Sequence, residues 1–289
     1  MTTMTTRRQH YVWRHYLRAW ANDEKIWCRR DGKIFATNLM NIGQQRDFYA
    51  LRRLSTEEET WILEQTRRRH NGDLNKHNEK FLSDYKLVSE ATTQTKNCEE
   101  LEALRIQFEE NMMTKIETSA IENLSKLQQR DSSFFLINEH RASFSHFLMI
   151  QLLRTKRMSH ALKNSLKSIL DKRGLGIENI WPPYKFINAA HMALTVYAEP
   201  KYKISLIRNT SNIEFITGDQ PIFNIHAVES TDQPPEKTDL FYPISPSLAI
   251  ILGKENHAKQ ATEIDVIKYD KWIKKSSHEQ IHSSSRDLL

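Results

Sequence analysis

The segment from His10 to Trp20 holds two His, two Arg and four aromatic residues within eleven positions. At the spacing i, i+3, i+4 and i+7, an apolar stripe consists of Trp13, Tyr16, Leu17 and Trp20. At i, i+4 and i+8, a basic stripe beside it consists of His10, Arg14 and Arg18. The pattern predicts a helix over residues 7–21 that buries its aromatic side and presents an imidazole and two guanidinium groups to an anion.

The most apolar predicted helix, within residues 133–170, contains a second candidate. Five positions with 4-3-4-3 spacing share one stripe, namely His140, Phe144, Phe147, Gln151 and Arg154. A buried guanidinium needs a carboxylate partner or an anionic ligand. Arg154 is therefore either half of a structural ion pair or part of a ligand site, with Gln151 beside it.

Two carboxylates complete the set of candidates. Asp219 directly follows a β-rich run and lies between Gly218 and Gln220-Pro221. Its side chain is either held at the end of a strand, as a catalytic carboxylate often is, or bonded to its own backbone in an Asx turn. Glu64 lies in an apolar segment of a predicted helix. It would pair with Arg154 or with a residue of the basic stripe, or it would face solvent.

The positive charge is concentrated near the start of the chain. The net charge is +6, and residues 1–53 hold 11 Lys and Arg against 4 Asp and Glu. A basic lobe predicts a polyanionic partner, either nucleic acid or nucleotide, through phosphate contacts. A solvated basic surface is the alternative.

A long amphipathic helix predicted over residues 99–128 carries an acidic outer face. Residues 99–122 include seven Glu against Arg105 and Lys115. Such a face is either solvated or a docking surface for a protein partner or a second copy of the chain.

Several classes of function are disfavoured by composition. Two Cys form neither a disulfide framework nor a four-thiolate zinc site. There is no metal-binding motif, phosphate-binding glycine loop, dinucleotide fingerprint or nucleophile elbow. An apolar leader and membrane-length apolar runs are also absent, so we expect a cytoplasmic protein with reduced thiols and no membrane partner.

The periodicities predict a mainly helical α+β fold in a single compact domain over residues 1–275. We expect an N-terminal helix and β-hairpin (7–50), a helical core (55–198), a β-rich part with a small antiparallel sheet (200–252), a C-terminal helix (255–275) and a polar tail (276–289). The hairpin should turn at Asp31-Gly32, and Ser55 with Glu58 should form a capping box. Pro182-Pro183 should open the last core helix, which ends near Tyr197.

Several motifs in this order resemble the prokaryotic domain-of-unknown-function family 4238. The family pattern His-Tyr-Val-Pro-x-x-Tyr-Leu-Arg-x-Phe is similar to His10 through Trp20, with Trp13 in place of Pro and Trp20 in place of Phe. The other matching elements are Phe48-Tyr49, an inward Glu (Glu64), Gln151-Leu152-Leu153-Arg154-Thr155, Gly218-Asp219-Gln220-Pro221 and Pro243 through Pro246. The resemblance spans most of residues 8–255. It does not indicate a catalysed reaction, because the family has no established activity.

Three functional interpretations follow. In the first, a nuclease-like or phosphodiesterase-like enzyme, of the kind found among prokaryotic toxins and phage-defence effectors, uses His10 as general acid or base with Asp219 or Glu64 as its partner. Its substrate-binding residues would be Arg14, Tyr16, Tyr49, Gln151 and Arg154. No resident metal is predicted, although carboxylates could recruit Mg²⁺. The second interpretation is a ligand-sensing or partner-binding module without turnover. The third is a purely structural network of buried ion pairs.

Overall fold

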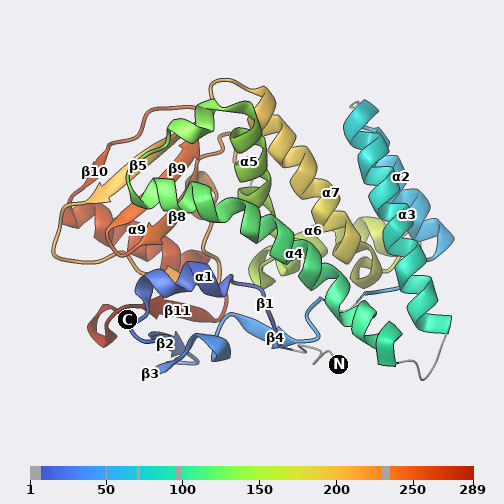
Figure 1. Ribbon diagram of the computed structural model, residues 1–289, viewed down its shortest axis with the longest axis horizontal. Coiled ribbons are helices and arrows are strands. Elements are labelled where there is room, and N and C mark those ends of the chain that lie inside the picture. Colours follow the sequence, from blue (N-terminus) through green and yellow to red (C-terminus); the bar gives the residue numbers. More distant parts are fainter. Residues whose placement is uncertain (1–7, 50, 70–71, 95–98, 230–234) are drawn as a thin grey trace.

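The computed structural model describes residues 8–49, 51–69, 72–94, 99–229 and 235–289. Its α-helices are α1 (Arg14–Leu17), α2 (Thr56–Arg67), α3 (Gly72–Gln94), α4 (Glu99–Gln128), α5 (Asn138–Leu153), α6 (Lys156–Asp171), α7 (Ile177–Ala198), α8 (Ile225–Glu229) and α9 (Glu263–Ser276). Short 3-10 helices are η1 (Arg18–Trp20), η2 (Leu39–Asn41), η3 (Ser133–Leu136) and η4 (Arg286–Leu288). Figure 1 shows α2 and α3 at one end of the molecule, with α5 and α7 between them and the strands at the other end. The mainly helical α+β class is confirmed.

The strands form three sheets within the described residues. They are β1 (Arg8–His10), β2 (Lys25–Arg30), β3 (Lys33–Asn38), β4 (Gln44–Arg46), β5 (Lys203–Asn209), β6 (Thr217–Gly218), β7 (Phe223–Asn224), β8 (Leu240–Ser245), β9 (Leu248–Gly253), β10 (Gln260–Ala261) and β11 (Gln280–Ser283). The sheet orders are β1-β4, β10-β5-β9-β8-β7 and β3-β2-β11-β6. All neighbouring strands are antiparallel except β10 and β5. The predicted β-rich part supplies most of the five-stranded sheet.

The predicted helix over residues 7–21 is wrong in its first half. Residues 8–10 form β1, because their backbone pairs with β4 in the register His10↔Gln44. The helix begins only at Arg14, and η1 continues it to Trp20. Tyr16, Leu17 and Trp20 are buried as the apolar stripe predicts. His10, however, lies on a strand, so the basic stripe of His10, Arg14 and Arg18 does not exist.

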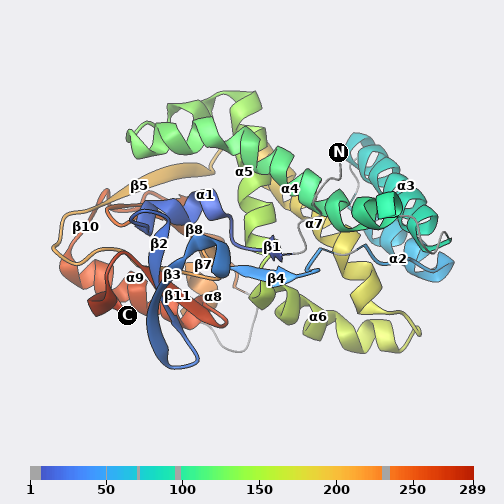
Figure 2. The same ribbon diagram turned by 60° about the horizontal axis from the view of Figure 1, so that its bottom comes forward.

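The predicted hairpin is present, with Asp31 and Gly32 at positive φ of 52° and 72°. It does not join the five-stranded sheet. Instead, β2 pairs with β11 from the end of the chain, and β11 pairs with β6. Figure 2 shows the hairpin projecting from the molecule beside β11.

The predicted polar tail over residues 276–289 is wrong. Residues 280–283 form β11, a fully buried inner strand between β2 and β6. The Gln280 side chain accepts a hydrogen bond from the backbone N–H of Gly43 (3.2 Å) and donates one to the Tyr11 hydroxyl (3.2 Å). These two hydrogen bonds satisfy the buried Gln280 side chain within the protein. Both ring nitrogens of the buried His282, by contrast, have no hydrogen-bond partner within the described residues.

Three helix boundaries also differ from the predictions. The helical stretch 133–170 is divided at Arg154 and Thr155, where α5 ends and Thr155 caps α6. The last core helix, α7, begins at Ile177, so Pro182 and Pro183 lie inside it rather than at its start. The C-terminal helix begins at Glu263 instead of residue 255, behind a Thr262–Asp265 capping box.

Glu58 explains how α7 begins before its two prolines. As predicted, it forms a capping box with Ser55, whose N–H donates to its carboxylate at 2.8 Å. The other carboxylate oxygen accepts from the backbone N–H of Gly176 and the amide of Asn179, both at 3.0 Å. One buried carboxylate thus caps α2 and fixes the N-terminal turn of α7.

Replacing Glu58 with Ala should lower the free energy of unfolding by about 2–4 kcal/mol, because the hydrogen bonds of the buried carboxylate are lost at two helix ends. Urea denaturation of the purified variant measures this. Glu57→Ala, an exposed acidic position in the same first turn, is the matched control and should change stability by less than about 1 kcal/mol. Equal effects of the two substitutions would contradict the double role of Glu58.

Asp270 of α9 holds the segment that leads into β6. Its carboxylate accepts from the backbone N–H of Ile216 at 3.2 Å. Burial raises the pKa of Asp270 to about 7, against the smaller opposing effects of this hydrogen bond and of Lys274. The folded protein therefore favours a protonated Asp270 near neutral pH.

The stability contributed by this group should be complete below pH 4 and should decrease as the pH rises through about 7, because the folded state holds a proton that the unfolded state releases. Asp270→Asn keeps the acceptor oxygen and cannot ionise. It should abolish this decrease, so that between pH 5 and 8 the variant loses about 1–3 kcal/mol less stability than the wild type. Parallel pH profiles of chemical denaturation with the same slope for both proteins would contradict the assignment.

Candidate functional site

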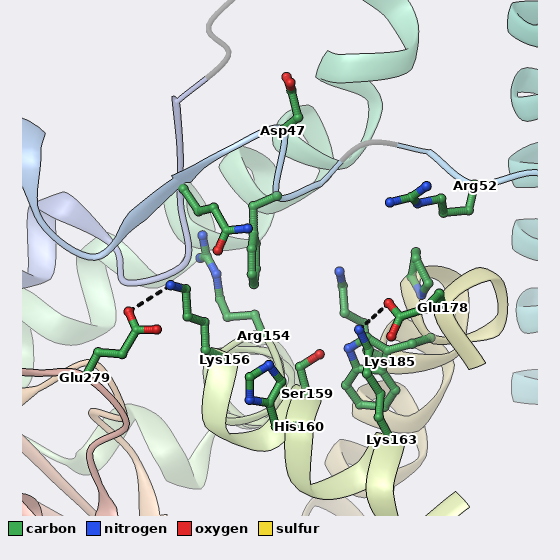
Figure 3. A pocket seen from close by; sticks show the side chains of 14 residues that line it. Asp47, Arg52, Arg154, Lys156, Ser159, His160, Lys163, Glu178, Lys185 and Glu279 are labelled. Atoms are coloured by element: carbon green, nitrogen blue, oxygen red, sulfur yellow. Dashed lines mark hydrogen bonds and ion pairs between the residues drawn. The ribbon is translucent and has the colours of Figure 1, made fainter. Parts of the chain in front are cut away.

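A pocket of about 340 Å³ lies where α6, α7 and the segment after β4 meet, and we call it the α6–α7 pocket. Figure 3 shows its side chains converging from these elements around a shared opening. The lining residues are Gln45, Asp47, Phe48, Arg52, Arg154, Lys156, Ser159, His160, Lys163, Glu178, Trp181, Pro182, Lys185 and Glu279. Its volume falls in the range of pockets that bind small ligands.

Two helix faces form most of the wall. On α6 the lining positions are Lys156, Ser159, His160 and Lys163, and on α7 they are Glu178, Trp181, Pro182 and Lys185. Both sets have the spacing i, i+3, i+4 and i+7, which is one face of a helix. Each helix therefore presents one face to the pocket, polar on α6 and mixed on α7, and the N-terminal turns of both lie beside it. The positive ends of the two helix dipoles add to the cationic character.

The pocket is rich in cations. Five Lys or Arg side chains line it against three acidic ones. At the rim, Lys156 pairs with Glu279 at 2.8 Å and Lys163 pairs with Glu178. The carboxylates of Glu178 and Glu279 are 66% and 39% exposed, so these rim pairs are weak and open to exchange with a ligand.

Arg154 forms part of the buried floor. Its Nε donates to the Tyr49 hydroxyl at 2.7 Å, and its terminal nitrogens donate to Glu117 and to the backbone carbonyl of His10. Burial by itself would lower the pKa of Arg154, but Tyr49 and Glu117 raise it above its usual range. The guanidinium is therefore charged and fixed in orientation, as an anion-binding group requires.

Lys185 forms the rest of the floor and pairs with buried Glu109 of α4. Burial raises the pKa of Glu109 to about 7, against the effect of Lys185, and burial lowers the pKa of Lys185. The pKa of neighbouring Glu110 is also raised by burial. Together with Glu117, these residues place three carboxylates of one helix behind two pocket cations.

The structure brings only Arg154, of the eight predicted site residues, to the lining of this pocket. Tyr49 contributes indirectly by accepting from Arg154 and donating to the His10 carbonyl at 3.0 Å. Gln151 is buried one turn before Arg154, and its amide nitrogen has no hydrogen-bond partner within the described residues.

The other predicted residues lie elsewhere. Tyr16 is buried, with its hydroxyl 2.6 Å from the Thr217 hydroxyl, and burial raises its pKa. Arg14 lies against the sulfur of Met40. Glu64 is exposed, 3.5 Å from Arg173, and does not reach Arg154. The expectation that Glu64 points inward is therefore wrong, because it occupies the solvent side of α2.

His10 contributes its backbone rather than its imidazole to the floor. Burial lowers the pKa of the ring to about 4, despite an opposing hydrogen bond with the backbone of Leu39. The imidazole is therefore neutral at physiological pH and is not part of the lining of the α6–α7 pocket.

Asp219 is buried and holds the segment between α9 and β11. Its Oδ1 accepts from the N–H of His278 at 2.7 Å, and its Oδ2 accepts from the N–H groups of Glu279 (2.7 Å) and Gln280 (3.1 Å). The backbone approaches so closely that a Cβ on Gly218 would lie 2.0 Å from the Ser277 hydroxyl. With both oxygens engaged, Asp219 positions Glu279 at the pocket rim instead of facing a substrate. The strand-exit motif is a structural clamp.

Asp219→Ala should therefore lower the free energy of unfolding by about 3–5 kcal/mol, because three buried N–H groups lose their acceptor. Asp219→Asn, which has one acceptor oxygen instead of two, should lose about 1–3 kcal/mol. Guanidinium denaturation gives both values. Wild-type stability in either variant would contradict the structural role and would make Asp219 a candidate catalytic residue again.

Sequence reasoning missed most of the pocket. The overlooked cations are Arg52, Lys156, Lys163 and Lys185, and the overlooked carboxylates behind the floor are Glu109, Glu110 and Glu117. A usable signal existed on α6, where Lys156, His160 and Lys163 recur on one face directly after the Gln151–Thr155 motif. The acidic face of α4 was recognised, but part of it is turned inward toward Arg154 and Lys185 rather than toward solvent.

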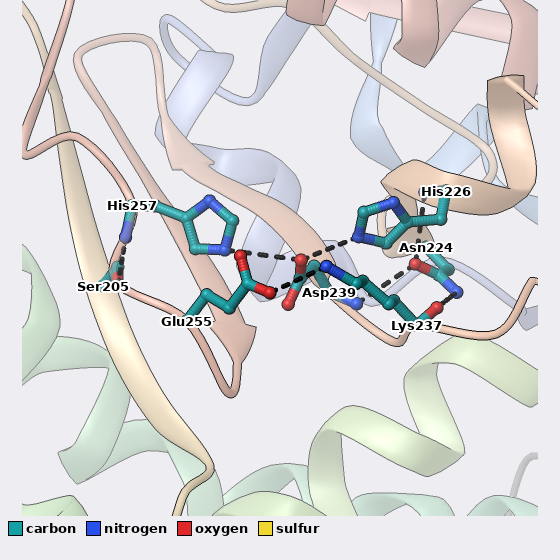
Figure 4. Close-up of polar contacts among 7 residues, drawn as sticks. All are labelled: Ser205, Asn224, His226, Lys237, Asp239, Glu255 and His257. Carbon is teal, nitrogen blue, oxygen red and sulfur yellow. Dashed lines mark hydrogen bonds and ion pairs between the residues drawn. The ribbon is translucent and has the colours of Figure 1, made fainter.

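A second polar cluster lies at the edge of the five-stranded sheet (Figure 4). One oxygen of Asp239 is 2.8 Å from His226 Nε2 and 3.5 Å from His257 Nε2. Asp239 also fills the space that a side chain on Gly253 would occupy, because a Cβ there would lie 2.0 Å from its carboxylate. Asn224 binds the backbone N–H groups of His226 and Asp239. The cluster joins the junction of β7 and α8 to the segments that precede β8 and follow β9.

Within the part of the chain that the structure describes, no group of three or more His, Cys, Asp or Glu side chains is arranged to hold a metal ion. None of the described helices combines the length and apolar character needed to span a bilayer.

The fold and the pocket together define a mainly helical α+β protein with a built cationic site. The chain matches the family described as "Protein of unknown function (DUF4238)" over residues 8–287. It belongs to this family, which confirms the resemblance seen in its motifs. Comparison with curated proteins gave no match, and comparison with solved structures gave none either.

Proposed function

We propose that this protein is a cytoplasmic nucleic-acid- or nucleotide-processing enzyme that holds phosphate groups of its substrate in the α6–α7 pocket. The observation that carries the proposal is the convergence of five Lys and Arg side chains, from three separate segments, on one concave site. Phosphate is the common biological anion that such a set of charged donors recognises.

The floor and the rim have different parts in this proposal. Arg154 and Lys185 are held by buried carboxylates, so their N–H groups are oriented before a ligand arrives. Lys156 and Lys163 belong to exposed ion pairs, which a phosphate can replace by exchanging one anion for another. Phe48 and Trp181 supply aromatic surface in the same wall for a base.

The reaction proposed is hydrolysis of a phosphodiester bond. His160, which is exposed at the pocket, is the imidazole placed to transfer a proton, in the role first considered for His10. Arg154 would stabilise the developing negative charge. Mg²⁺ would be held jointly by substrate phosphates and one or two rim carboxylates, as is usual for this ion. A role as a toxin or phage-defence component stays a prediction.

The test uses fluorescently labelled DNA, RNA and nucleotides with MgCl₂ or EDTA. The double variant Lys156→Ala/Lys163→Ala should weaken binding about 10- to 100-fold, because two charge-assisted contacts are lost. His160→Ala should bind normally and lower turnover about 100-fold. The matched control is Lys167→Ala, an exposed Lys of α6 that does not line the pocket.

Wild-type protein that binds none of these ligands would overturn the proposal. Binding that depends on Lys156 and Lys163 but gives no turnover would identify a ligand-sensing module instead. Turnover that is unchanged in His160→Ala would remove this imidazole from the mechanism.

A further inference from the structure

A second basic pocket adjoins the α6–α7 pocket. It has a volume of about 310 Å³ and lies between the β2–β3 hairpin and the C-terminal end of α9, and we call it the hairpin pocket. Its charged and titratable lining residues are Arg29, Arg30, Asp31, Lys274, His278 and Glu279. Two of its cations, Arg29 and Arg30, come from the basic N-terminal part of the chain. Among the described residues, Arg52 is the one cation from that part that lines the α6–α7 pocket.

The two pockets meet along a short ridge. Glu279 lines both of them. The imidazole of His160 from the first pocket packs edge-on against that of His278 from the second, with ring centroids 4.8 Å apart. Because Asp219 accepts from the backbone of both His278 and Glu279, the ridge is fixed to the protein core. The pockets are therefore neighbouring parts of one surface.

We propose that a single-stranded nucleic acid lies across this ridge, with one phosphate in each pocket, which deepens the proposed function and rests on it. Each pocket lies at the lower end of the volume range of small-ligand sites, so a mononucleotide in one leaves the cations of the other unused. A flexible strand can follow two hollows separated by a ridge and stack its bases on ring side chains. A duplex is stiff over the length of two neighbouring pockets. Its phosphates therefore cannot follow both hollows.

We call the surface across the two pockets the track. Glu279 lowers the affinity of the track for a phosphate backbone. Its carboxylate is 39% exposed on the ridge and pairs with Lys156 at 2.8 Å. A phosphate backbone that crosses the ridge approaches this negative charge and competes with it for Lys156. Removing the charge therefore favours any phosphate that binds Lys156, including those of the strand.

The experiment measures fluorescence anisotropy of labelled oligothymidylate and oligouridylate of one, two, four and ten nucleotides over a range of salt concentrations. The decamer should bind at least about tenfold more tightly than the mononucleotide, since it makes additional phosphate contacts. Arg30→Ala/Lys274→Ala should weaken decamer binding about tenfold and leave mononucleotide binding unchanged. It should also reduce the slope of log affinity against log salt concentration by about 1.4, because two phosphate contacts are lost. Glu279→Gln should tighten decamer binding.

Lys167→Ala serves again as control, and circular dichroism checks that each variant is folded. Equal affinity for mononucleotide and decamer, or a decamer affinity unaffected by Arg30→Ala/Lys274→Ala, would overturn the track while leaving the phosphate pocket in place. A ten-base-pair duplex that binds as tightly as the single strand would also overturn it. Absence of binding at every length would reject the proposed function itself.

Discussion

The guanidinium of Arg154 is buried at the point where α5 ends, and an isolated charge in such a place is strongly unfavourable. Three segments satisfy it together, because Tyr49, Glu117 of α4 and the backbone carbonyl of His10 in β1 all accept its hydrogen bonds. Losing any one partner leaves a buried cation incompletely paired, which costs far more than an exposed pair is worth. The relative positions of α4, α5 and β1 are therefore tied to one side chain.

The same electrostatic logic extends across the pocket. Carboxylates of α4 lie behind the floor cations, whereas the rim cations pair with exposed carboxylates from α7 and from the segment that Asp219 holds. Buried pairs in a low-dielectric interior fix geometry, and exposed pairs exchange readily. The pocket thus combines a rigid anion-binding floor with a rim that can reorganise around a ligand.

Features encoded by neighbouring residues were predicted well. The hairpin turn at Asp31-Gly32, the capping box of Ser55 and Glu58, and the long helix over residues 99–128 are all present. Arg154 was recognised as a buried cation that needs either a carboxylate or a ligand, and the structure shows that it has Glu117 while still lining a pocket. The sequence did not predict that Asp219 would bind the chain sixty residues later.

The amino-acid order determined the helical character, the local turns and caps, the basic N-terminal part and the family of this protein, since each depends on residues a few positions apart. Tertiary structure alone decided that residues 280–283 form a buried strand with β2, that His10 lies on a strand, and that α6 and α7 place charged side chains in one pocket. Contacts between different elements of the fold leave no periodic signal in the sequence, because their geometry arises only when the whole core packs.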